Sequence, residues 1–94
     1  MKHALLLLAA AATLWTAPPA TAADGPLFSC VSAATNVCRF RIFYATGGDR
    51  IVFLTGGMQQ NVPGVTVGKD GYCVAINETP RYRCAWKLVA ASNS

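Results

Sequence analysis

The part of the chain after residue 23 is short and contains four cysteines, Cys30, Cys38, Cys73 and Cys84. A domain of fewer than about 80 residues has a marginal hydrophobic core, and an even number of cysteines in so short a domain indicates disulfides when the compartment is oxidising, as the leader described below suggests. Seven residues separate the first two cysteines and ten the last two, unlike the short gaps of structural zinc sites, and the only histidine is His3. We therefore expect two disulfides and no metal site.

The sequence leaves the disulfide connectivity open. A tight turn over residues 78–79 would place Cys73 opposite Cys84 on neighbouring strands, which favours the local pairing Cys30–Cys38 with Cys73–Cys84. A bridge from Cys38 to Cys84 would close a longer loop, and its chain-entropy effect is about 4 kcal/mol against about 2.5 kcal/mol for a short loop. We favour the local pairing and keep the crossed pairing as the alternative.

Residues 1–23 have the layout of a secretory signal peptide: a short basic start, an apolar run over residues 4–15 and small residues at 20–23. The run is shorter than the roughly 20 residues that a membrane-spanning helix needs. The Ala-rich leader is typical of bacterial export. We expect cleavage after Ala22 or Ala23, a secreted or periplasmic protein without a transmembrane segment, and one domain over residues 24–94.

The remaining chain has a β composition, because short runs rich in Val, Ile, Phe, Tyr and Thr alternate with Gly and Pro breaks. We predict an all-β fold, a small antiparallel meander of five or six short strands in a sandwich or open barrel. Residues 50–55 are apolar on both faces, which favours a central strand. Residues 90–94 are expected to fray.

Two of these runs alternate with the two-residue period of a strand. In residues 37–45 one face carries Cys38, Phe40, Ile42 and Tyr44, and the other carries Arg39, Arg41 and Phe43. Residues 82–89 are expected to form a second such strand, with Trp86 facing the core and with Arg83 and Lys87 facing outward.

The sequence lacks the residues that common enzyme chemistry needs. No histidine follows residue 23 to activate a nucleophile, and the four carboxylates there, Asp24, Asp49, Asp70 and Glu78, all lie in or beside Gly and Pro turns, where polar residues are expected. No glycine motif for phosphate binding is present. We expect a protein that is not an enzyme and has no cofactor.

The predicted strands would gather cations on one surface. The candidate binding face consists of Arg39, Arg41, Phe43, Arg81, Arg83 and Lys87. Such a face can hold an acidic protein or an envelope polyanion, or it can simply solvate a sheet. Seven of the eight Lys and Arg residues and all four Asp and Glu residues follow residue 23, and the resulting charge of +3 is too modest for a dedicated nucleic-acid binder.

We therefore expect a small exported binding protein, and the sequence does not identify its partner. One alternative is a secreted enzyme inhibitor that acts through a rigid turn over residues 56–64. Another is a structural component of the cell envelope.

Overall fold

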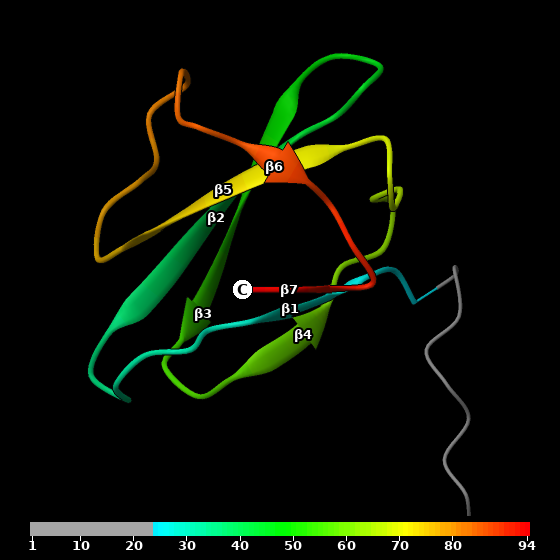
Figure 1. Cartoon of the computed structure of the whole chain (residues 1–94). Coiled ribbons are helices and arrows are strands. Elements are labelled where there is room, and N and C mark those ends of the chain that lie inside the picture. Colours follow the sequence, from blue (N-terminus) through cyan, green and yellow to red (C-terminus); the bar gives the residue numbers. More distant parts are fainter. Residues whose placement is uncertain (1–23) are drawn as a thin grey trace, which may run out of the picture.

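The computed structural model describes residues 24–94, so the predicted signal peptide lies outside the described residues. These residues form seven β-strands and no helix (Figure 1). The strands are β1 (Leu27–Ser29), β2 (Val37–Phe43), β3 (Asp49–Thr55), β4 (Gln59–Asn61), β5 (Gly71–Ile76), β6 (Lys87–Leu88) and β7 (Ser92–Asn93). Among them there is no helix long and apolar enough to cross a membrane.

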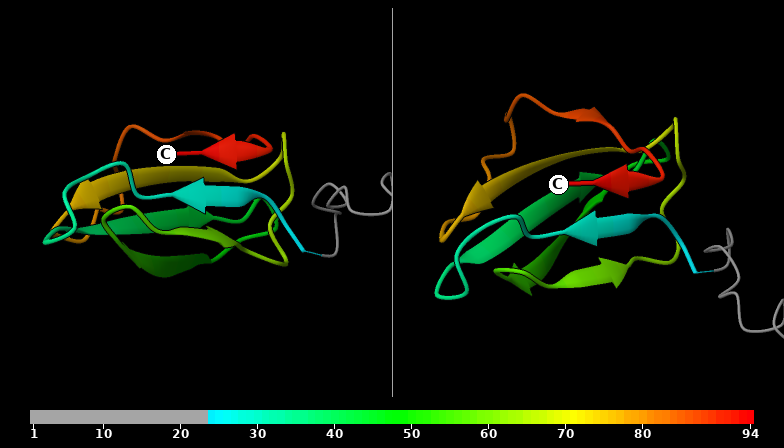
Figure 2. Two further views of the ribbon diagram at one scale, coloured as in Figure 1. Left: turned by 90° about the horizontal axis from the view of Figure 1, so that it is seen from below. Right: turned by 60° about the horizontal axis from the view of Figure 1, so that its bottom comes forward.

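The strands form two sheets, which confirms the predicted all-β class. The larger sheet has the order β3-β2-β5-β6 and is antiparallel throughout. The smaller has the order β4-β1-β7, in which β1 is antiparallel to β4 and parallel to β7 (Figure 2). The structure has one or two more strands than we predicted, and β5 pairs with β2 rather than with its predecessor, so the order departs from a sequential meander.

The inner faces of the two sheets share one core, and β2 lies at its centre. Cys38, Phe40 and Ile42 of β2 are buried, and the residues between them are only partly buried, which confirms the predicted alternation. Phe28 of the smaller sheet meets the rings of Phe40 and Tyr72 edge-on, with ring centroids 5.2 and 5.4 Å away. These three rings join the two sheets.

The first disulfide also joins the two sheets. Cys30 directly follows β1, Cys38 is the second residue of β2, and both are buried in the core. The second disulfide joins Cys73 to Cys84. The structure thus confirms two disulfides and the local pairing.

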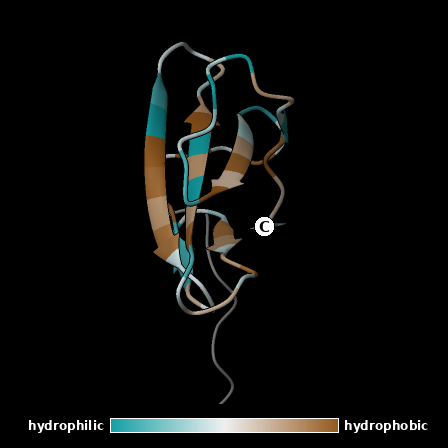
Figure 3. Cartoon of the chain, turned by 90° about the vertical axis from the view of Figure 1, so that its left-hand side faces the viewer, coloured by the Kyte–Doolittle hydropathy of each residue, from teal (hydrophilic) through white to brown (hydrophobic). Residues whose placement is uncertain are grey.

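The prediction that residues 50–55 form a central strand was wrong, because β3 is an edge strand. Its apolar run forms the unbroken brown stretch of β3 in Figure 3. Val52 and Leu54 enter the core, whereas Phe53 is 61% exposed on the other face. The guanidinium of Arg39 lies over the Phe53 ring at 5.4 Å, which gives this outward apolar residue a partner.

The predicted strand over residues 82–89 was also largely wrong. Only Lys87 and Leu88 are in a strand, and Trp86 is 57% exposed rather than buried in the core. Lys87 pairs directly with Tyr72, whose ring belongs to the core, so Lys87 lies on the inner side of the sheet. Lys87 and Trp86 are therefore placed opposite to the prediction, whereas Arg83 is exposed as predicted.

Residues 90–94 do not fray as predicted. Asn93 of β7 is buried, and its side-chain amide accepts from the N–H of Ala90 and donates to the carbonyl of Leu27. The Leu27 N–H donates to the carbonyl of Ala91 at 2.9 Å. These bonds fasten the last described residues to β1.

Candidate functional site

The face of the larger sheet that points away from the core, here called the outer face, carries three of the predicted residues. Arg39, Arg41 and Phe43 alternate with the buried residues of β2 and lie together on this face. In the ladder with β3, Arg39 lies opposite Phe53 and Arg41 opposite Ile51. The outer face therefore combines two arginines with apolar side chains.

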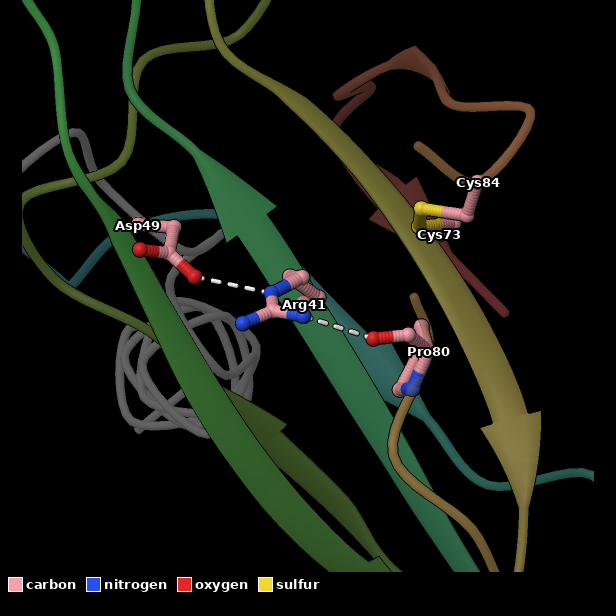
Figure 4. Close-up of polar contacts among 5 residues, drawn as sticks. All are labelled: Arg41, Asp49, Cys73, Pro80 and Cys84. Atoms are coloured by element: carbon pink, nitrogen blue, oxygen red, sulfur yellow. Dashed lines mark hydrogen bonds and ion pairs between the residues drawn. A yellow bond between two sulfur atoms is a disulfide. The ribbon is translucent and has the colours of Figure 1, made fainter. Parts of the chain in front are cut away.

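This face is not open to solvent as predicted, because residues 77–86, here called the covering segment, fold over it. Arg41 donates from Nη1 to the carbonyl of Pro80 at 2.7 Å and from Nε to the Asp49 carboxylate at 2.8 Å (Figure 4). Arg39 donates from Nη1 to the Thr79 hydroxyl at 3.1 Å. Arg39 and Arg41 are thus half-buried and hold the covering segment in place.

A disulfide and an aromatic pair add to these polar contacts. Cys73 lies opposite Arg41 on the outer face, and its bond to Cys84 fastens the far end of the covering segment. The Tyr82 ring meets Phe43 edge-on at 5.7 Å, and the Arg41 guanidinium lies over the same ring at 5.6 Å. The covering segment is therefore fixed at several points along its length.

The covering segment presents two of the predicted cations to solvent. Arg81 and Arg83 are exposed, and neither forms an ion pair within residues 24–94. Tyr82 between them is 68% exposed. A groove of about 310 Å³ opens beside them, and it is lined by Val74, Ala75, Glu78, Thr79, Pro80, Arg81, Arg83 and Cys84.

Lys87 was wrongly placed on the same face as the arginines. Its ammonium lies 5.3 Å from the centre of the Tyr72 ring, on the inner side of the larger sheet. The structure therefore brings Arg39, Arg41 and Phe43 together under the covering segment, sets Arg81 and Arg83 on it, and separates Lys87 from all five.

Sequence reasoning missed the exposed aromatic residues of this site, Tyr82 and Trp86. A sequence signal for this segment is the run of turn-forming residues at 77–80, which ends in a proline and indicates that the chain leaves the strand here. Asn77 has a positive φ of 62°, and its side chain accepts from the Val37 N–H, so the chain leaves β5 here instead of turning into a hairpin strand.

The indole ring of Trp86 occupies the space above Gly71, where a Cβ atom would collide with it. We expect Gly71→Ala to destabilise the protein by about 1–3 kcal/mol, as overpacking does, and to displace the ring. Denaturant unfolding followed by circular dichroism measures the cost. In a Trp86→Ala background the same change should cost much less, and equal costs in both backgrounds would show that the ring does not restrict this position.

The described residues offer no group of three His, Cys, Asp or Glu side chains that could hold a metal ion. Comparison with protein-family models, with curated proteins and with solved structures finds no match to this chain. The contacts of the covering segment are therefore the basis for a functional proposal.

Proposed function

We propose that the protein is an exported binding protein, not an enzyme, and that it engages an anionic partner through the covering segment. The observation that carries this proposal is the pair of exposed arginines without ion-pair partners among residues 24–94, Arg81 and Arg83, on a segment fixed by a disulfide. The partner class is an acidic protein or an envelope polyanion.

The composition of the covering segment supports this proposal. Arginine, tyrosine and tryptophan are the residue types most often found at the energetic centres of interfaces, and the covering segment exposes all three. Because the segment is already fastened to the sheet, binding orders few additional residues, which lowers its entropic cost. The two disulfides also suit export, since such bonds persist in oxidising compartments.

The alternative of an inhibitor that inserts residues 56–64 has less support. Residues Gln59–Asn61 of that turn form β4 and pair with β1, and Val62 is buried. A purely structural role in the envelope remains the outcome if no anionic partner binds.

Heparin, a sulfated polyanion, serves as the probe for the proposed function. We expect Arg81→Gln/Arg83→Gln to elute from a heparin column at clearly lower salt than the unchanged protein, because each exposed cation releases about one counterion on binding. The matched control is Arg50→Gln/Lys69→Gln, which removes the same charge from two exposed positions outside the covering segment. If both variants elute at the same salt concentration, net charge alone governs retention and the proposed site is wrong.

A further inference from the structure

Part of β5 has an unpaired edge. Asn77, directly after β5, donates its N–H to the Val37 carbonyl at 2.7 Å, on the side of β2. Backbone groups along an antiparallel strand alternate between its two neighbours, so those of Cys73 and Ala75 face β2 and those of Val74 and Ile76 face away.

The opposite side of β5 is covered only at its beginning. There β6 pairs with Gly71 and Tyr72, and the Val89 N–H bonds to the carbonyl of Asp70, the residue that precedes β5. Beyond this point no residue of the described chain bonds to the outward N–H and C=O groups of Val74 and Ile76. These two residues therefore leave two donors and two acceptors free.

The groove described above lies beside this part of β5, because Val74 and Ala75 are among its lining residues and the covering segment supplies the other six. The charge of the groove is positive. Arg81 and Arg83 line it, and the only carboxylate in its lining belongs to Glu78. Arg39 bonds to Thr79, another lining residue, and its buried Nε has no acceptor among residues 24–94.

We propose that this groove binds an extended acidic peptide, which adds to the larger sheet as a strand along Val74–Ile76. This inference rests on the proposed function and specifies its partner. Free N–H and C=O groups in alternation match the backbone of an extended peptide, and main-chain pairing of this kind is a known mode of peptide recognition. The carboxylates of the peptide pair with Arg81 and Arg83.

Amide hydrogen exchange in the oxidised protein tests the edge itself. We expect slow exchange at Cys73 and Ala75, whose N–H groups face β2, and fast exchange at Val74 and Ile76. Binding of an acidic peptide should then slow exchange at Val74 and Ile76. If these two amides are already protected in the free protein, the edge is closed and the proposal fails.

The binding probe is a capped synthetic peptide of eight alternating glutamate and valine residues. Its control has the same sequence with alternate backbone nitrogens methylated, which removes hydrogen-bond donors and keeps the charges. We expect the unmethylated peptide to bind at least tenfold more tightly. If the two peptides bind with equal affinity, and both bind more weakly to the Arg81→Gln/Arg83→Gln variant, strand addition is overturned and anion binding is left intact. If the two peptides bind with equal affinity and the double substitution changes neither affinity, both strand addition and anion binding through these arginines are overturned.

A pair of substitutions in the protein gives a second measurement. Ile76→Pro removes the outward N–H without removing a bond to β2, and proline is tolerated at such edge positions. Ile76→Ala shortens the side chain and keeps the N–H. We expect at least tenfold weaker peptide binding for the proline variant and at most a threefold change for the alanine variant. If both variants bind as the unchanged protein does, the peptide does not pair with this edge.

Discussion

Phe28→Ala should leave the domain largely unfolded at room temperature. Phe28 is fully buried, and its ring contacts the rings of Phe40 and Tyr72 from the opposite sheet. Truncation of a buried phenylalanine costs about 3–5 kcal/mol, and each edge-to-face pair adds about 0.5–1.5 kcal/mol. Because a domain this small has a free energy of unfolding near the lower end of about 5–15 kcal/mol, the loss is comparable to its total stability. Thermal unfolding followed by circular dichroism measures it.

Phe53→Ala is the matched control, because it removes the same atoms from a ring that is 61% exposed on the outer face. It loses mainly the contact with the Arg39 guanidinium, so we expect a cost of at most about 1 kcal/mol. Similar melting temperatures for the two variants would show that the two sheets do not depend on the shared aromatic core.

The second large effect concerns the disulfide between Cys30 and Cys38. The substitution of both residues by alanine should destabilise the domain by about 2–5 kcal/mol and lower its melting temperature sharply. This bridge is buried in the core and joins the end of β1 to β2. Its loss therefore weakens the contact between the two sheets and also increases the conformational freedom of the unfolded chain.

The Cys73→Ala/Cys84→Ala variant separates these two contributions. The two disulfides have sequence separations of 8 and 11, so their chain-entropy effects differ by only about 0.3 kcal/mol. We expect the Cys73 and Cys84 variant to be the more stable of the two and to elute from heparin at lower salt than the unchanged protein, because the far end of the covering segment is released while the core remains. Equal stabilities would mean that core packing around Cys30 and Cys38 contributes little.

The β2 strand could be predicted from the sequence because apolar residues alternate with two arginines, and the structure buries the first set fully and the second only partly. The face of Trp86 could also have been inferred by combining two signals. The alternation of residues 72–77 places Cys73 and Tyr72 on different faces of the same strand. The disulfide from Cys73 then brings Cys84 to the outer face of the sheet. Trp86 lies two positions beyond Cys84, so an extended chain places it on the same side as Cys84, and it is exposed there. Tyr82 does not follow this alternation, because residues 82–83 form a turn closed by a bond from the Cys84 N–H to the Arg81 carbonyl.

Other features were not predictable from local pattern. The apolar run of β3 is typical of a central strand, but β3 lies at an edge, where the tertiary contact with Arg39 partly covers the outward Phe53 ring. The β7 strand consists of two polar residues, and its position depends on a bond from Asn93 to Leu27, 66 residues away. Arg81 and Arg83 are exposed as predicted, but their placement depends on the path of the covering segment, and their role in binding stays a prediction.

The parallel pairing of β1 with β7 has a consequence for how a growing chain reaches this fold. A nascent chain emerges N-terminus first, so β1 leaves the ribosome long before its partner is synthesised. The bonds from Leu27 to Ala91 and from Asn93 to Leu27 can form only once these last residues are free. The smaller sheet therefore closes only after residue 93 has been synthesised, whereas the pairing of β1 with β4 needs nothing beyond Asn61.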